Sequence, residues 1–179
     1  SLLKKKFPER FSFYEEKFSN LNNVVEKKLK PRAIIFDLGL SSFQLSDEAR
    51  GFSFESKNFL NMEMGINECS AYETINNLDK EYLATIIKVL GDEKDGKKIA
   101  NTIDKHRKRK PIKSSQELSS IINSAKKNYN NYKKNPSTKT FQAIRIFVNK
   151  ELTELVKGLV EAAKILSDGG ILIVVSFHS

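Results

Sequence analysis

Two groups of polar side chains follow short apolar runs in the sequence, and they are the first candidates for chemistry. Asp37 comes directly after the apolar run 33–36, Ser176 lies near the end of the apolar run 170–177, and His178 follows that run. Ligands of open parallel sheets bind beyond the carboxyl ends of the strands. A carboxylate, a hydroxyl and an imidazole at that edge could accept or donate a proton. The competing interpretations are a loop-bracing carboxylate for Asp37 and an ordinary surface histidine for His178.

Several familiar catalytic motifs are incomplete around these residues. A phosphatase of the haloacid dehalogenase type needs a second Asp two residues after its nucleophile, and Gly39 occupies that position. The sequence Ser176-Phe-His-Ser lacks the glycines of the Gly-x-Ser-x-Gly hydrolase elbow, and no Gly-rich phosphate loop occurs. One Cys and two His cannot supply the four ligands of a structural zinc site, so no metal is expected.

The helical pattern near residue 145 offers a binding surface rather than a reactive one. Gln142, Arg145 and Asn149 are spaced i, i+3 and i+7, so they share one face of a helix and could meet a ligand or a neighbouring loop. The competing interpretation is an exposed polar face.

A basic tract is the second candidate binding surface. It contains Arg107, Lys108, Arg109 and Lys110, and tyrosines occur among the lysines farther along the chain. Lysine and arginine can hold phosphates while aromatic rings stack on bases, so this tract could bind RNA. The competing interpretation is a charged helix end.

The charge of the chain is concentrated in one segment. The net charge is +9, and residues 80–140 hold 16 basic and 6 acidic residues, so the remainder is close to neutral. A strongly basic segment on a nearly neutral body suggests a polyanionic partner, because nucleic-acid binding releases condensed counterions. A solvated basic surface remains the alternative.

Hydrophobic spacing predicts the elements that position these residues. Apolar runs predict buried strands at 33–36 and 171–177, and one continuous stripe predicts a single helix from 138 to 166. Ser-x-x-Glu spacings at 70–73 and 114–117 predict helix starts, as does Asp79. Residues 40–68 are expected to form a long structured loop. A strand, a long excursion, a helix and a strand indicate an α/β fold with a parallel sheet.

Length and composition limit the remaining possibilities. The 179 residues, 39% of them hydrophobic, are enough for one folded domain. No window approaches the roughly 20 apolar residues of a bilayer span, and the N-terminus lacks a secretory signal, so a cytoplasmic protein without a membrane partner is expected. Because the sequence starts at Ser1 and stops directly after a strand-like run, a fragment is expected.

Four stretches together resemble one family. They are FDLGLSSFQL (36–45), RGFSF (50–54), NPSTKTFQAIRIFVN (135–149) and GGILIVVSFHS (169–179). In order and spacing they are similar to the bacterial 16S ribosomal RNA cytosine-N4 methyltransferases, the MraW-like enzymes that use S-adenosylmethionine. The resemblance covers nearly the whole chain.

The resemblance implies a Rossmann-like class I methyltransferase sheet, here incomplete, at 1–68 and 137–179, with an inserted, basic, all-helical RNA-recognition domain at 69–136. It assigns cofactor contacts to Phe18, Asp37 and Gln44. The family's Gly-rich cofactor loop and acidic ribose-binding residue are expected upstream of Ser1. The implied partner is the small ribosomal subunit, and a homodimer is a further candidate assembly.

Some positions depart from the family pattern. Phe43 stands where the family has Pro, and Asn61 and Glu63 stand in a run that the family writes Leu-Asp-Met-Arg-Met. Other departures replace Glu by Asp92, Arg by Lys94, His by Asn135 and Arg by Lys139. The Glu63 change reverses a charge close to the expected site.

Methylation of a cytosine N4 amine sets the chemistry that these residues would perform. The lone pair of N4 is delocalised into the ring, so an enzyme must align the amine and accept a hydrogen bond from it. Candidate acceptors are Asp37, Ser41 and Ser42, with Ser176 and His178 across the same crevice. Two alternatives stay open: a non-catalytic RNA-binding fragment or degenerate homologue, and a related methyltransferase that modifies DNA or protein.

Overall fold

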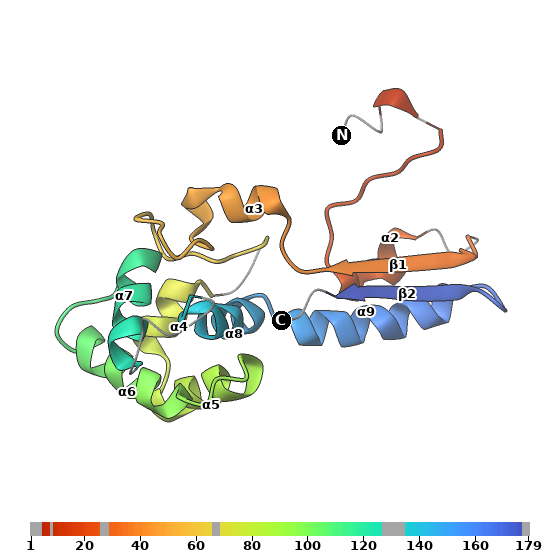
Figure 1. The fold of residues 1–179 in the computed structure, drawn as a ribbon. Coiled ribbons are helices and arrows are strands. Elements are labelled where there is room, and N and C mark those ends of the chain that lie inside the picture. Colours follow the sequence, from red (N-terminus) through yellow and green to blue (C-terminus); the bar gives the residue numbers. More distant parts are fainter. Residues whose placement is uncertain (1–4, 8, 26–28, 66–68, 127–134, 177–179) are drawn as a thin grey trace. The chain divides into compact units, whose positions relative to one another are not determined.

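The computed structural model describes residues 5–7, 9–25, 29–65, 69–126 and 135–176 (Figure 1). The chain divides into two compact units, Ser1–Gly39 with Leu152–Ser179, and Leu40–Glu151. The sequence predicts a helical domain at 69–136, whereas the compact helical unit is longer at both ends. Residues 40–68 and 137–151 therefore group with the helices and not with the sheet.

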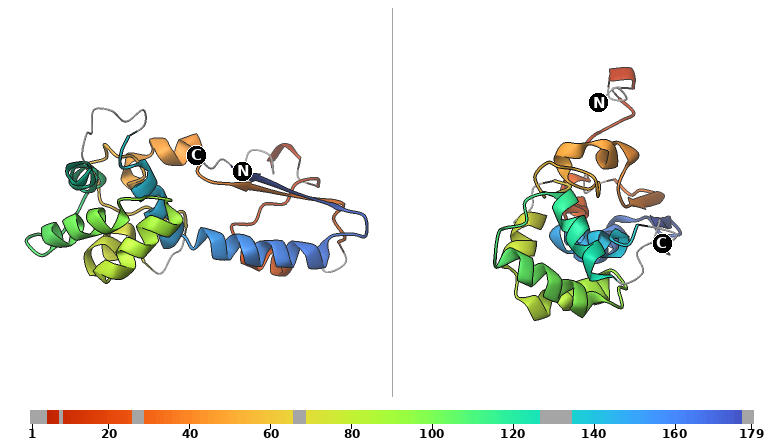
Figure 2. Two further views of the ribbon diagram at one scale, coloured as in Figure 1. Left: turned by 60° about the horizontal axis from the view of Figure 1, so that its bottom comes forward. Right: turned by 60° about the vertical axis from the view of Figure 1, so that its left-hand side comes forward.

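The first unit is built on two parallel strands. Strand β1 (Ala33–Leu38) pairs with β2 (Ile171–Ser176) in a register that runs from Ala33 opposite Ile171 to Leu38 opposite Ser176. Helix α9 (Glu151–Ile165) runs beside the two strands, and η1 (Phe18–Asn20) and α2 (Leu21–Val24) precede β1 (Figures 1 and 2). The parallel pair and its helix confirm the α/β arrangement.

One face of the two-stranded sheet is packed on α9. Phe36 is 3% exposed and its ring lies edge-on to Phe18, with centroids 5.1 Å apart. On the other face Ile35 is 63% exposed. The prediction of strands buried on both faces is therefore wrong for the described residues, because side chains alternate between faces and the helix covers only one of them.

Gly158 allows α9 to approach β1 closely. A Cβ atom at this position would lie 2.7 Å from Phe18 Cβ and 3.0 Å from Phe36 Cε1. A methyl group would push the helix away from the strand that carries Asp37. The glycine is therefore required by the packing of the first unit.

Gly158→Ala should destabilise the protein by about 1–3 kcal/mol, because overpacking forces the helix or the two rings to move. Urea unfolding of the full-length protein measures this change. Gly65→Ala is the matched control, since nothing lies within 4 Å of its added Cβ and no left-handed φ is required there. Equal stability of the Gly158→Ala variant and the parent would contradict this account.

The second unit consists of short helices around one apolar core. These are α3 (Ser42–Ser46), η2 (Glu48–Arg50), α4 (Ala71–Asn77), α5 (Lys80–Leu90), α6 (Gly96–Arg107), α7 (Ser115–Ala125) and α8 (Thr138–Val148). Fully buried isoleucine and leucine side chains of α4 to α8 form the core, among them Ile75, Ile87, Ile99, Leu118 and Ile144.

The predicted helix starts are confirmed. Ser70 and Glu73 form a reciprocal capping box, and Asp79 accepts hydrogen bonds from the first amides of α5. Ser114 caps α7 by accepting from the Glu117 amide, but the Glu117 carboxylate accepts from the Lys113 amide instead of the Ser114 amide. The local spacing of these residues was sufficient to locate the helix starts.

The single helix predicted for 138–166 is wrong, because the chain forms two helices instead. Helix α8 ends at Val148, and Lys150 has a left-handed φ of 50° before α9 begins. The buried side chain of Asn149 bonds the backbone of Met62 and Met64 as well as the Arg145 carbonyl of α8. These contacts favour a break over continued helix.

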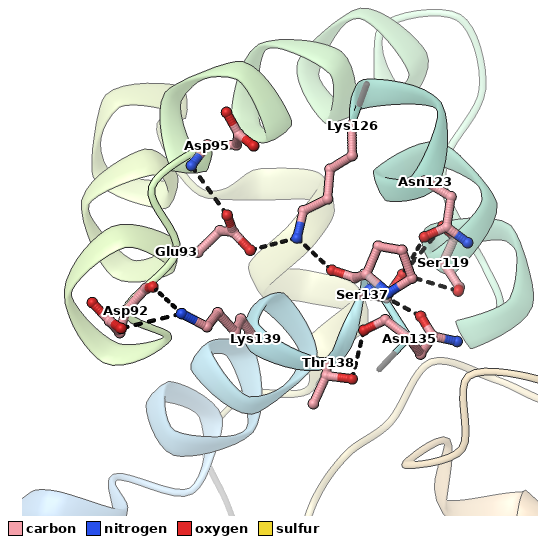
Figure 3. A network of polar contacts seen from close by, with 11 residues as sticks. Asp92, Glu93, Asp95, Ser119, Asn123, Lys126, Asn135, Ser137, Thr138 and Lys139 are labelled. Atoms are coloured by element: carbon pink, nitrogen blue, oxygen red, sulfur yellow. Dashed lines mark hydrogen bonds and ion pairs between the residues drawn. The ribbon is translucent and has the colours of Figure 1, made fainter. Parts of the chain in front are cut away.

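A buried ion pair joins three segments of the second unit (Figure 3). Lys126, at the end of α7, donates to Glu93 Oε2 and to the carbonyl of Pro136, each at 2.5 Å. The other carboxylate oxygen of Glu93 accepts from the Asp95 amide. A buried charge is tolerated only when it is paired and hydrogen-bonded, so this contact fixes where α7 ends and α8 begins.

Ser137 extends this polar network. It is fully buried and its hydroxyl bonds the Ser119 hydroxyl and Asn123 Oδ1, while its amide donates to Asn135 Oδ1 (Figure 3). Asn135 thus stabilises the backbone directly before the first residue of α8. This is a structural role for a position where the family pattern has His.

Two further departures from the family pattern are partners of one another. Lys139 Nζ lies 2.7 Å from the Asp92 carbonyl oxygen and 3.1 Å from its carboxylate (Figure 3). Asp92 has a left-handed φ of 47°, a conformation that Asp adopts more readily than most residues. Asp92, which is shorter than the Glu of the family pattern, and Lys139, which replaces its Arg, therefore form one compatible ion pair.

Candidate functional site

Asp37 lies at the carboxyl edge of the two-stranded sheet. It pairs with Val175 in the strand register, and the next pair is Leu38 with Ser176. The structure therefore brings Asp37 and Ser176 to the same edge, as predicted. The exposed Asp37 carboxylate has no hydrogen-bond or ion-pair partner among the described residues. His178, the third predicted residue of this edge, lies outside the described residues.

Phe18 lies next to this edge within the same unit. Its ring contacts Phe36, the neighbour of Asp37, and remains 39% exposed. The following residue, Ser19, donates its amide to Glu154 of α9 at 3.2 Å. The 3-10 turn is thereby held against the helix, and an open aromatic surface stays beside the strand that carries Asp37.

Ser41, Ser42 and Gln44 belong to the second compact unit and form the start of α3. Ser41 is the N-cap residue, and its hydroxyl accepts from the Gln44 amide at 3.2 Å. The Gln44 side-chain oxygen accepts from the Ser41 amide at 3.0 Å. The Ser-x-x-Gln spacing is that of a capping box, and α3 is a short helical turn within the segment 40–68, for which the sequence predicts a long structured loop with a helical turn.

The predicted polar face of the helix is used largely for internal contacts. Arg145 makes a paired contact with the Glu151 carboxylate, at 2.7 and 3.0 Å. Asn149 is buried and donates to the Met62 and Arg145 carbonyls at 2.8 and 2.9 Å. Its side-chain oxygen accepts from the Met64 amide at 2.7 Å. Gln142, two turns before Asn149, is half-buried.

Asn149 supports the loop in which the sequence departs from its family. Met62 is buried and has a left-handed φ of 59°. Such a conformation costs energy in a bulky residue, so the loop needs external contacts to hold it. Asn149 supplies two of them, since it donates to the Met62 carbonyl and accepts from the Met64 amide, and these bonds fix the backbone around Glu63.

Asn149→Ala should lower the free energy of unfolding by about 2–4 kcal/mol, because it leaves the Met64 N–H and the Met62 carbonyl without their partner. Chemical denaturation of the full-length protein gives the value. Asn77→Ala is the matched control, since Asn77 is exposed and its side chain has no hydrogen bond to the described residues. If the free energy of unfolding falls equally in both variants, the Asn149 contacts do not support the loop.

The basic tract separates into an internal part and an exposed part. Arg107 is largely buried, pairs with Asp104 at 2.9 Å and donates to the Ile75 carbonyl at 2.8 Å. Lys108 is exposed and pairs with Asp104 at 2.8 Å. Arg109 and Lys110 are exposed and make no ion pair with the described residues. Of the predicted RNA contacts in this tract, Arg107 thus already has a structural role.

Hydrogen bonds from Lys108 and Arg107, together with their positive charges, hold the pKa of Asp104 below its ordinary value, and partial burial opposes them. The stabilisation that these contacts of Asp104 provide is therefore complete above the pKa of the carboxyl in the unfolded chain, about 3.9. It is lost as the pH falls through the lower pKa of Asp104 in the folded protein.

Asp104→Asn should be less stable than the parent at pH 7, and the difference should shrink as the pH falls below the ordinary carboxyl value of 3.8 and vanish once the carboxylate of the folded parent is protonated as well. Thermal unfolding across this pH range tests it. Glu15→Gln removes an exposed carboxylate without a partner among the described residues and should show no such trend. A difference for Asp104→Asn that does not depend on pH would rule out the ion-pair explanation.

Comparison with known proteins identifies the family. The pattern of the MraW methylase family matches residues 2–179. The chain belongs to the MraW methylase family. It is 44% identical over 177 residues to the "Ribosomal RNA small subunit methyltransferase H" of Ehrlichia chaffeensis, and 40% identical over 179 residues to the protein of that name from Sulfurihydrogenibium.

These matches cover 97% and 98% of this chain but 60% and 61% of the two relatives. The chain thus spans about three fifths of the length of the curated relatives that it matches. Within the part of the chain that the structure describes, no helix is both long and apolar enough to cross a membrane. The resemblance to MraW-like enzymes in the sequence is confirmed.

Proposed function

We propose that the full-length protein containing this chain is a cytoplasmic, S-adenosylmethionine-dependent methyltransferase that methylates the N4 amine of a cytidine in 16S ribosomal RNA. One observation carries the proposal. A member of the MraW methylase family has an exposed carboxylate, Asp37, at the carboxyl edge of a parallel strand pair, and this carboxylate has no partner in the described part of the chain. The printed names of the relatives support small-subunit ribosomal RNA as the acceptor.

The residues of the first unit fit a cationic, partly aromatic methyl donor. The Asp37 carboxylate, which has no partner among the described residues, would favour the positive charge of a sulfonium. The partly exposed ring of Phe18, which packs on Phe36 on the α9 face of the strand, would offer an apolar surface to the rest of the donor. S-adenosylmethionine, when bound, supplies the electrophilic methyl group. Gln44 would add its side-chain amide nitrogen, because its oxygen is engaged by the Ser41 amide.

The same edge can assist the cytidine amine. In this proposal Asp37 or a neighbouring hydroxyl accepts a hydrogen bond from the N4 amine, which localises the nitrogen lone pair for attack. Ser176, on the adjacent strand, orients the base from the other side. Ser41, Ser42 and His178 remain candidates for these roles. The target cytidine must leave its stack to reach them.

The fold proposed for the first unit is part of a Rossmann-like class I methyltransferase sheet. Its parallel strands and the helix on one face are the observations that support this assignment. The second unit is proposed to recognise RNA as an inserted helical domain, because residues 80–140 carry 16 basic and 6 acidic residues. Arg109 and Lys110 are the tract members that would contact phosphates most directly.

Asp37→Ala in the full-length protein should lower the rate of methyl transfer by about 100-fold or more, a typical loss on removing a positioned acid or base group. The assay uses small ribosomal subunits and S-adenosylmethionine with an isotope in its methyl group. Digestion of the RNA to nucleosides then identifies the product, expected to be N4-methylcytidine. The melting temperature of the variant should match that of the parent.

Asp168→Ala is the matched control, because Asp168 is exposed and precedes β2 at the opposite edge of the sheet. It should keep parental activity. If the parent methylates DNA or protein in place of ribosomal RNA, the proposed acceptor is wrong. If the parent binds RNA but transfers no methyl group, the protein is an RNA-binding protein and not an enzyme. Full activity in Asp37→Ala would overturn the assignment of the site.

A further inference from the structure

A partly exposed aromatic pair occurs on the second unit, and no role was assigned to it above. The rings of Phe59 and Tyr72 have centroids 5.1 Å apart and an interplanar angle of 36°. Tyr72 packs against the apolar core, whereas Phe59 is 52% exposed. The inner ring is thus fixed by packing, and the outer ring presents its surface to solvent.

Backbone contacts fix the position of Phe59. The residue forms an isolated antiparallel bridge with Ser114, and the next residue, Leu60, donates its amide to the Lys113 carbonyl at 2.9 Å. The Leu60 carbonyl accepts from the Tyr72 amide at 2.8 Å. Such an aromatic surface loses little conformational freedom when a ligand binds, because its backbone is already held.

The segment that directly follows the basic tract is bonded to both elements that carry the aromatic pair. Asn76, one turn after Tyr72 on α4, donates to both the Tyr72 and the Ile112 carbonyls, at 2.8 and 2.9 Å. Its side-chain oxygen accepts from the Ile112 amide at 2.9 Å. Ile112 is therefore held by α4, and Lys113 is held by the segment that carries Phe59.

Four cations without acidic partners among the described residues lie near the pair or its bonded segments in the sequence. Lys57, Arg109, Lys110 and Lys113 are exposed and make no ion pair with the described residues. The nearby carboxylate of Glu117 already accepts a hydrogen bond from the Lys113 amide. An aromatic surface flanked by available cations is the combination that binds single-stranded nucleic acid, through base stacking and phosphate contacts.

We propose that Phe59, supported by Tyr72, is a stacking site for an unpaired base of the RNA substrate, and that Lys57, Lys110 and Lys113 bind the adjoining phosphates. The inference rests on the proposed function for the identity of the RNA. It adds a positioning contact on the helical unit, remote in sequence from Asp37. Stacking selects for an unpaired base of any type, because every base has an aromatic face.

The test measures binding of the full-length protein to a fluorescein-labelled decamer of uridine by fluorescence anisotropy. Phe59→Leu keeps an apolar side chain but removes the aromatic face, and should weaken binding by about fivefold or more. Phe59→Trp keeps a stacking surface and should bind at least as tightly as the parent. This variant adds an indole emission to that of the parent, and the added emission should be quenched when a base stacks on the ring.

Tyr82→Leu is the matched control. Tyr82 is 51% exposed and contacts Phe147 edge-on at 6.0 Å, but it lies at the start of α5, outside the basic tract. This variant should bind as the parent does. Lys113→Gln should reduce the salt dependence of binding by about 0.7 in the slope of log K against log salt, whereas Phe59→Leu should leave that slope unchanged.

The outcomes separate this inference from the proposed function. Unchanged binding by Phe59→Leu, or an equal loss in Phe59→Leu and Phe59→Trp, overturns the stacking site. A loss seen only with assembled small subunits and not with the uridine decamer indicates a protein contact and overturns it as well. If the stacking results hold but the parent methylates no ribosomal RNA, the proposed function fails and the stacking site remains.

Discussion

The first unit depends on the parallel pairing of β1 with β2. Parallel strands cannot be joined by a tight turn, so the chain must leave after Gly39 and return through a helix that packs on the sheet. The return is possible because Gly158 has no side chain to separate α9 from Phe36 and Phe18. This pairing also brings Asp37 and Ser176 to one edge. The proposed chemistry therefore follows from strand register as much as from the identity of the reactive groups.

The second unit is fixed by polar contacts placed inside an apolar core. Lys126, Glu93 and the Pro136 carbonyl join the ends of three segments, and Asn149 joins α8 to the loop that contains Met62. Buried polar groups of this kind contribute little net stability, because desolvation offsets the attraction. They do penalise every arrangement in which one partner is missing. Their main effect is thus to select one packing of short helices among several that would bury similar apolar area.

Local signals in the sequence predicted the helix starts at Ser70, Asp79 and Ser114, and strand position predicted the shared edge of Asp37 and Ser176. The break at Lys150 was missed because the apolar stripe continues through it, and the cause is a contact between Asn149 and Met64, 85 residues apart. The internal partners of Arg107 and Gln44 were missed for a related reason. A basic or amide side chain looks the same in a sequence whether it faces solvent or a backbone carbonyl.

The contact of Lys126 also has a consequence for how this part of the protein can change. Its ammonium group joins the end of α7 to the Pro136 carbonyl, ten positions farther along the chain, and pairs with the buried Glu93 carboxylate. Loss of the ammonium group alone would leave the Glu93 carboxylate buried without this cation, which costs more than the pair contributes to stability. Substitutions at positions 93 and 126 should therefore be tolerated together rather than singly.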